Sequence, residues 1–504
     1  MAYAHYERLT ALDATFLEVE DHNTHMHVGA VSLFDAQPLA QADGTLDIDR
    51  IRRLVEIGIQ RVPRYRQRLA TIPFFGYPAW VDDDRFNVHY HVRHVRLPGR
   101  GDERVLKRLT GRIMSQQLDR GKPLWELWVV EGVEGNRLAL ITKAHHCMID
   151  GVGSVELTGA FMRQTAEFER ELAKPVKWLP RPVPTPAQLL AGELQRRAAE
   201  PFEAMSALRR ALGDPLGSLG SMRNALGGIG EAIGAGALPA SPTPLNVDIG
   251  PHRRFDWLEM DLSAVKNVKN QLGGTLNDIV LAVVAGALRH FLHGRGLRTD
   301  HLDFRAMIPV NVRTEDERES MGNRVAMMVA QLPLAERDPR QRLRRVIETT
   351  RELKQSRQAL GVRALEEISD WTVTTLFSAF VRLSTMSRPY NVVVTNVPGP
   401  QVPIYFLGAP MRSVYPLVPL NANQALGIAL FSYNAGLFWG FNADWDAVPD
   451  LHELVEAIRT EFDRLREAAA AGPIEPSAAP DPGGRRPARR RAGATRGGAK
   501  RQAS

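Results

Sequence analysis

Two proline-rich stretches divide this sequence more firmly than any other feature. The first, Lys174–Pro186, contains five prolines, and the second, Ser241–Pro251, contains three more. Proline fixes φ and lacks a backbone N–H, so neither stretch can form a helix interior or a central strand. We therefore interpret 173–250 as a crossover between two folded halves, 1–172 and 251–471, which a tail at 472–504 follows.

Both halves mix strand-like and helix-like hydrophobic periods, a pattern typical of an α/β fold. The predicted elements are strands at Met26–Phe34, Leu138–Lys143 and Asn391–Thr395, a hairpin at Ile428–Asp444, and helices at Glu103–Leu118, Val152–Met162, Ala187–Arg210, Asn277–Leu292, Pro339–Leu360 and Leu451–Ala471. The crossover helix interleaves leucines with arginines, so it either lies in a membrane interface or covers the protein body.

The net positive charge of the chain comes from its C-terminal tail. The 504 residues carry a formal net charge of +7, yet residues 485–504 hold eight basic residues and no acidic one, which leaves the rest near −1. We therefore expect no specific nucleic-acid partner for the folded body. The tail is too poor in apolar residues to order itself. It could attract anionic headgroups or nucleic acid, or only keep the protein in solution.

Hydropathy and cysteine content set further limits. The longest uncharged apolar run, Ile279–Leu288, has ten residues, about half of what a bilayer-spanning helix needs. The N-terminus shows no signal-peptide pattern. We therefore expect a cytoplasmic protein, with at most peripheral contact to the inner membrane face or to lipid inclusions. The single cysteine, Cys147, excludes an internal disulfide and a multi-cysteine metal site.

The segment Ala144–Gly151, AHHCMIDG, is the densest group of chemically useful residues. Two histidines end a buried-type strand, and an Asp-Gly pair follows. An imidazole can take up and return a proton near neutral pH. Because neighbouring strand residues point to opposite faces, only one of His145 and His146 can face a given cleft. Asp150 could orient an imidazole ring or hold the loop through an arginine; alternatively, the segment is a core strand followed by a turn.

Here the sequence resembles a known family. HHCMIDG fits the HHxxxDG signature of acyl-CoA-dependent acyltransferases with the chloramphenicol-acetyltransferase-like fold, and further segments are similar to the bacterial wax ester synthase/diacylglycerol acyltransferases. In chain order these segments are LDATFLEVE, MHVG, the PLW of Pro123–Trp125, the Asn277-Asp278 pair, IPVNVR, GNRV, TNVPGP, YPLVPL and NADWDAVPD. The match runs from about Leu9 to Leu465.

The resemblance implies two mixed-sheet subdomains with an active-site channel between them. It implies transfer of an acyl group from acyl-CoA, a co-substrate, to a diacylglycerol or a fatty alcohol, without another cofactor. Carried onto this chain, it makes His146 the general base, with His145 and Asp150 in support.

The resemblance also suggests substrate contacts for Gly151, Trp125, Asn277 and Asp278. For Trp125 the other interpretation is simple packing. For the Asn277-Asp278 pair the other interpretation is a helix N-terminus.

Four other interpretations stay open at this point. Cys147 beside the histidines could be a nucleophile. His89 and His91, placed on one strand face, could bind a metal together with His94 or with His22, His25 and His27, although we expect no metal site. An acyltransferase of the same fold could use another donor or alcohol. A non-catalytic lipid-surface protein could also keep the fold, but the motif residues are intact in this chain.

Overall fold

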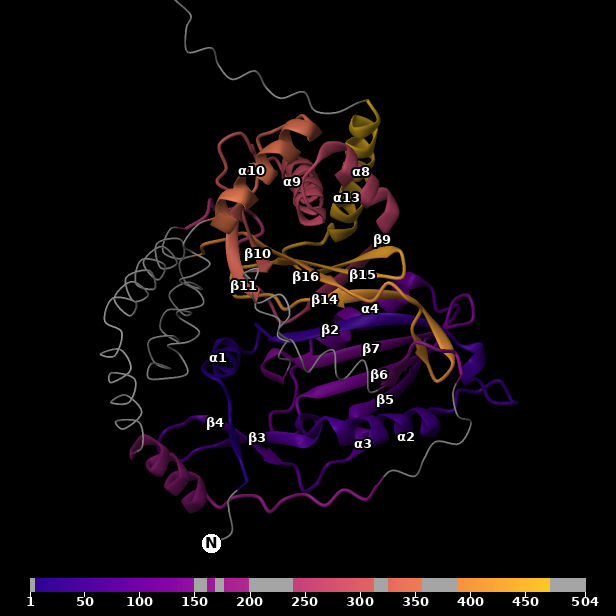
Figure 1. Cartoon of the computed structure of the whole chain (residues 1–504), viewed down its shortest axis with the longest axis vertical. Coiled ribbons are helices and arrows are strands. Elements are labelled where there is room, and N and C mark those ends of the chain that lie inside the picture. The colour runs from indigo at the N-terminus through magenta and orange to yellow at the C-terminus, as the bar shows by residue number, and fades with distance from the viewer. Residues whose placement is uncertain are drawn as a thin grey trace, which may run out of the picture.

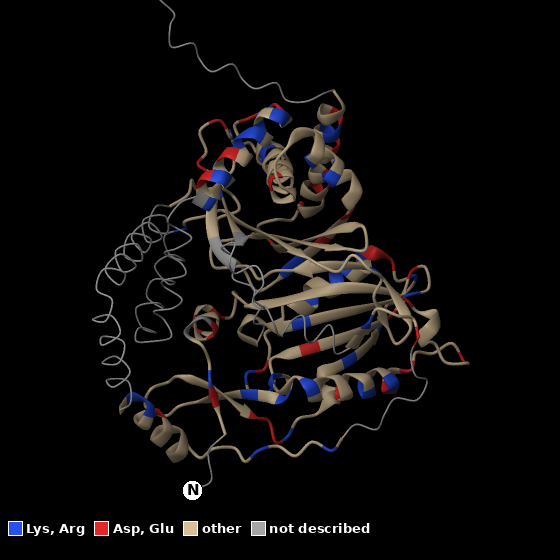
Figure 2. Cartoon of the chain, viewed as in Figure 1, with Lys and Arg blue, Asp and Glu red and all other residues tan. Residues whose placement is uncertain are grey.

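The computed structural model describes residues 5–148, 161–167, 176–198, 239–311, 325–355 and 388–471. It shows two large mixed sheets packed on one another, with helices around them and one helix between them (Figure 1). The predicted α/β class is confirmed. Basic and acidic residues are interspersed over both halves (Figure 2), in keeping with a near-neutral body.

The first sheet has seven strands in the order β5-β6-β7-β2-β14-β13-β8. Its strands are β2 (His27–Asp35), β5 (Val92–Arg96), β6 (Trp125–Val133), β7 (Arg137–His145), β8 (Met162–Arg163), β13 (Tyr405–Phe406) and β14 (Ala409–Leu417). β5 and β6 are parallel, and the other pairs are antiparallel. A three-stranded sheet, β1-β4-β3, lies beside it and consists of β1 (Glu7–Arg8), β3 (Gln67–Thr71) and β4 (Pro78–Asp82).

The second sheet has six strands in the order β11-β10-β12-β15-β16-β9. Its strands are β9 (Arg253–Asp261), β10 (Arg305–Asn311), β11 (Val325–Gln331), β12 (Val392–Pro398), β15 (Leu426–Tyr433) and β16 (Gly436–Asp444). The predicted hairpin is confirmed as β15–β16, and positive φ angles at Asn434 and Ala435 make its tight turn.

Helices surround the two sheets (Figure 1), except α4, which lies between the first sheet and β9. Those of the first half are α1 (Ala11–Val19), α2 (Ile48–Gly58), α3 (Val88–His91) and α4 (Glu103–Met114), with 3₁₀ turns η1 (Gln37–Leu39), η2 (Ile59–Arg61), η3 (Pro63–Arg66) and η4 (His146–Met148). Those of the second half are α8 (Leu262–Leu272), α9 (Leu276–Gly294), α10 (Pro339–Gln355) and α13 (Leu451–Ala470). Residues 186–198 of the crossover are also helical.

Helix α9 is the core of the second half. Among the described residues it alone is long and apolar enough to cross a membrane, but 72% of that window is buried inside the protein. α8, α10 and α13 pack around it and enclose it on the six-stranded sheet. Its apolar surface is therefore explained by packing.

The two halves interlock at strand β14. β14 belongs to the second half in sequence, yet it pairs with β2 in the first sheet, from Met411 opposite Phe34 to Leu417 opposite Gly29. Gly440 of β16 lets the two sheets approach closely, because a Cβ there would lie 1.8 Å from the carbonyl oxygen of Pro416. The two halves of the sequence, divided at residue 251, therefore do not correspond to the two sheets.

Several predicted boundaries need correction. The helix predicted to Leu118 ends at Met114, and the strand predicted through His89 and His91 is instead the short helix α3, capped by the Asn87 side chain. The predicted helix near Val152–Met162 lies almost wholly outside the described residues. So do the second half of the crossover helix and the basic tail, whose lipid or nucleic-acid contacts stay predictions.

Candidate functional site

The two histidines at the end of strand β7 lie in different surroundings. His145 is its last residue, opposite His27 of β2, and the chain then turns into η4 at His146. The backbone N–H of His145 donates to the carbonyl of Leu124 (2.9 Å), and that of His146 donates to the carbonyl of Met26 (2.8 Å). Backbone hydrogen bonds therefore hold the strand end on both sides, independently of any contact that the imidazole rings make.

The ring of His146 lies against helix α1. Its centroid is 4.0 Å from that of Phe16, with the planes tilted by 31°, and the residue as a whole keeps a part of its surface exposed. Burial of the ring, helped by the neighbouring His145, lowers the pKa of His146 to about 4. The imidazole is thus neutral at pH 7 and can accept a proton. Its Nδ1 is buried and has no hydrogen-bond partner in the described part of the chain.

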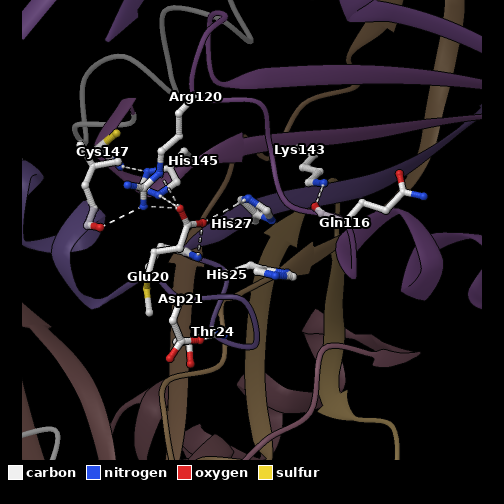
Figure 3. A network of polar contacts seen from close by, with 12 residues as sticks. Glu20, Asp21, Thr24, His25, His27, Gln116, Arg120, Lys143, His145 and Cys147 are labelled. Atoms are coloured by element: carbon white, nitrogen blue, oxygen red, sulfur yellow. Dashed lines mark hydrogen bonds and ion pairs between the residues drawn. The ribbon is translucent and has the colours of Figure 1, made fainter. Parts of the chain in front are cut away.

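The ring of His145 faces a buried carboxylate instead (Figure 3). Glu20, which caps the C-terminus of α1, places Oε2 at 3.5 Å from His145 Nε2 and Oε1 at 3.6 Å from His27 Nε2. Arg120 donates to Oε2 at 3.2 and 2.7 Å. Burial alone would raise the pKa of Glu20, but its contacts with His145 and Arg120 lower it to about 2. The carboxylate is therefore ionised and closely held.

A buried lysine fixes the neighbouring connection between α4 and β6. Lys143 of β7 donates to the carbonyls of Ile113 (2.9 Å) and Gln116 at the C-terminal end of α4. Burial lowers its pKa to about 8. A cation is favourable at this negative end of a helix. Lys143 thus anchors the start of the segment that carries Arg120 (Figure 3).

The structure places the other predicted site residues as follows. Asp150 and Gly151 lie outside the described residues, so their roles stay predictions. Trp125 is buried: its Nε1 donates to the carbonyl of Tyr65 (2.8 Å), and its ring stacks on His91 at 4.5 Å. These contacts match the packing interpretation of Trp125.

The Asn277-Asp278 pair begins helix α9. Both oxygens of Asp278 accept hydrogen bonds from protein groups, one from Thr275 in a capping box and one from the Thr350 hydroxyl at 2.7 Å. Asn277 is exposed and accepts from the Asn396 amide at 2.7 Å. Asp278 therefore stabilises the helix start, and only Asn277 offers a side chain to solvent.

The two competing chemistries are not favoured by this geometry. Burial raises the pKa of the Cys147 thiol far above neutral pH, which suppresses the thiolate that a nucleophile needs. His91 is buried between aromatic rings, while His94 contacts Glu131 at 3.0 Å. No group of three His, Cys, Asp or Glu residues that could hold a metal ion occurs among the residues that the structure describes.

Sequence reasoning missed the partners of the two histidines. Phe16 and Glu20 lie in the LDATFLEVE segment, and Arg120 just before PLW, but nothing in their spacing pairs them with residues 145 and 146. The channel predicted between the halves also stays a prediction, since residues 149–160, which follow His146 after the two residues Cys147 and Met148, lie outside the described part. What the described residues do offer is a neutral imidazole on a rigid strand end, suited to general-base catalysis.

Comparison with known proteins points to one family. The model of the wax ester synthase/diacylglycerol acyltransferase catalytic domain matches residues 9–280, and that of the corresponding C-terminal domain matches residues 321–466. A Mycobacterium tuberculosis protein named as a probable diacylglycerol O-acyltransferase is 31% identical over 470 residues, which cover 91% of this chain and 95% of the relative.

Solved structures show the same fold. The wax ester synthase/diacylglycerol acyltransferase of Marinobacter aquaeolei VT8 superposes with a TM-score of 0.64 at 24% identity, over 92% of this chain and all of the other. The first condensation domain of the calcium-dependent antibiotic synthetase superposes with a TM-score of 0.55 at 17% identity, over 93% of this chain and 98% of the other. At these identities the likeness concerns the fold alone.

Proposed function

The chain belongs to the wax ester synthase/diacylglycerol acyltransferase family, and from this premise we propose that it makes triacylglycerol from acyl-CoA and diacylglycerol, with His146 as the general base. The family makes the chain an acyl-CoA-dependent acyltransferase. The specific acceptor and the role of His146 are the proposal. Wax ester synthesis from a fatty alcohol is a second activity of the same chemistry.

The proposed reaction needs one proton transfer in each direction. The acceptor hydroxyl loses its proton to His146 as its oxygen attacks the thioester carbonyl. The resulting tetrahedral intermediate collapses, the C–S bond breaks, and protonated His146 returns the proton to the thiolate of coenzyme A. The products are an ester and free coenzyme A. No electrons leave or enter the substrates, so the step calls for no redox cofactor.

The observation that carries this proposal is the position of His146, which is tied to the end of β7 by backbone hydrogen bonds with its ring against Phe16. A base must be unprotonated at the working pH, and burial against Phe16 lowers the pKa of this imidazole to about 4. A positioned base typically contributes a rate factor of about 10² to 10⁴. His145 is an unsuitable base, since it is buried against Glu20.

Product analysis tests the proposal directly. Purified protein is supplied with radiolabelled acyl-CoA and, in separate reactions, with diacylglycerol, with hexadecanol or with no acceptor, and the lipids are separated by chromatography. We expect labelled triacylglycerol, with or without wax ester. Label in wax ester alone would show that the acceptor is a fatty alcohol and not diacylglycerol. No labelled ester with either acceptor would refute the proposed acceptors and favour another alcohol or a non-catalytic role.

We also propose that the protein is cytoplasmic and contacts a membrane or lipid inclusion peripherally. Val176, Leu179 and Leu194 of the crossover expose 74%, 76% and 52% of their surfaces, and Lys177 lies between the first two in sequence. Apolar and basic side chains together favour an anionic lipid interface. Flotation with anionic vesicles tests this contact: the wild type should float, and a protein with Val176, Leu179 and Leu194 changed to serine should float less.

A further inference from the structure

Glu20 is the least expected charged group near the histidines. It ends helix α1, the same helix that places Phe16 against the His146 ring, and its side chain is 1% exposed. An isolated carboxylate at such a depth would be strongly disfavoured. Its retention in ionised form, with several partners gathered around it, is a costly arrangement that calls for a role.

The contacts of Glu20 converge on the strand end that bears His146. Oε2 lies 3.5 Å from His145 Nε2, an ion-pair contact that draws the ring preceding the base toward the carboxylate. His145 Nδ1 in turn accepts the backbone N–H of Cys147 at 3.2 Å, which places a constraint on the residue that follows the base. One anion thus holds the chain on both sides of His146.

A second path reaches His146 through Met26, the residue before β2. Glu20 Oε1 accepts the backbone N–H of Met26 at 3.4 Å, and the carbonyl of Met26 accepts the backbone N–H of His146 at 2.8 Å. The carboxylate and the catalytic residue therefore hold opposite ends of the same short segment. A displacement of Glu20 would be transmitted to the backbone of His146 through only one intervening residue.

The charge on Glu20 is needed for this arrangement. An ionised carboxylate only accepts hydrogen bonds, and Glu20 accepts from Arg120 at 2.7 Å while it faces His27 and His145. A glutamine of equal size would direct an N–H₂ group toward one of these donors. Arg120 would then lose a partner, and the His145 ring would lose the anion that orients it.

We propose that Glu20 is a positioning residue for the acyl transfer: through His145 and the Met26 peptide it holds His146 in the orientation that accepts the proton. It touches neither substrate nor the reacting atoms. This inference rests on the proposed function of His146 and extends it to a residue outside the HHxxxDG motif. A misplacement of about 1 Å at a catalytic group can cost about 10²-fold in rate.

Kinetics of Glu20→Gln and Glu20→Asp test the proposal. Per folded molecule, Glu20→Gln should lower kcat by about 10- to 100-fold and change KM less than threefold, because a positioning defect affects the transition state more than binding. Glu20→Asp keeps the charge and should recover part of the loss. The matched control is Glu461→Gln, since Glu461 of α13 is also 1% exposed but contacts Arg342 in the second half. It should leave kcat unchanged.

Unchanged kcat in Glu20→Gln, or equal kcat in the Gln and Asp variants, would overturn the proposal. If Glu20→Gln does not fold, Glu20→Asp decides alone: a lower kcat at constant KM supports the role, and wild-type kcat refutes it. A crystal structure of the folded variant separates this failure from that of the proposed function. An unmoved His145 ring and Met26 peptide would refute the positioning role even if the wild type proved inactive on both acceptors.

Discussion

Gly111 lets helix α4 of the first half touch strand β9 of the second. A Cβ at position 111 would lie 2.6 Å from the carbonyl oxygen of Arg253, whereas an ordinary contact needs about 3.4 Å. The partner is a backbone atom of a strand that pairs with β16, so it has little freedom to yield. Gly111→Ala therefore requires α4 and β9 to separate by up to about 0.8 Å.

Two opposing energy terms decide whether this substitution raises or lowers the free energy of unfolding. Alanine is more favourable than glycine inside a helix by about 1 kcal/mol. Overpacking in a tightly packed interior costs about 1–3 kcal/mol, and the short backbone contact puts Gly111 near the upper end. Separation would also stretch the bond from the Arg253 N–H to the Ser115 hydroxyl (2.8 Å). We expect Gly111→Ala to lower the free energy of unfolding by about 1–2 kcal/mol.

Urea denaturation followed by tryptophan fluorescence measures this difference. Gly294→Ala, at the end of α9, is the matched control, because a Cβ there meets nothing within 4 Å. The control should be neutral or stabilised by up to about 1 kcal/mol, as helix propensity alone dictates. If Gly111→Ala proved as stable as the wild type or more stable, the close contact between α4 and β9 would not constrain the fold as argued.

Three further predictions concern the site. Because burial lowers the pKa of His146 to about 4, kcat/KM should stay flat from pH 8 to pH 6 and fall only as protonation sets in toward pH 4; a midpoint at or above pH 6.5 would contradict this. Since burial raises the pKa of the Cys147 thiol, iodoacetamide at pH 7.5 should leave the folded protein active, and rapid inactivation would argue for an accessible thiolate. Asp278→Ala should cost about 1–3 kcal/mol in urea denaturation through loss of the cap and the Thr350 bond, whereas a substrate-binding role would appear as a raised KM in the folded protein.

Local periodicity predicted the elements whose partners are close in sequence. The hairpin at residues 428–444 and the helix from Leu451 were found because strand and helix periods are strong there and turn signals bound them. The strand assigned to His89 and His91 was wrong, since the Asn87 cap can begin a helical turn that is too short to show a period. Short elements carry too few residues for a pattern.

The pairing of strands that lie far apart in the sequence leaves no comparable pattern in it. β14 reads as a strand of the second half but pairs with β2, some 380 positions away, and no turn residue indicates that exchange. Glu20 illustrates the same limit at the site: a glutamate at a helix end is ordinarily a solvated residue, and only folding brings Arg120 and His145 to it. The motif predicted His146 as the base, but only tertiary structure brings the carboxylate of Glu20 to within 3.5 Å of the neighbouring His145.

Matched His146→Ala and Cys147→Ala proteins test the central claim most directly, by the initial rate of labelled triacylglycerol formation from acyl-CoA and diacylglycerol. The account predicts that His146→Ala loses about 10²- to 10⁴-fold in rate while it remains folded, and that Cys147→Ala stays within a few-fold of the wild type. An active His146→Ala protein, or loss of activity in Cys147→Ala alone, would contradict it.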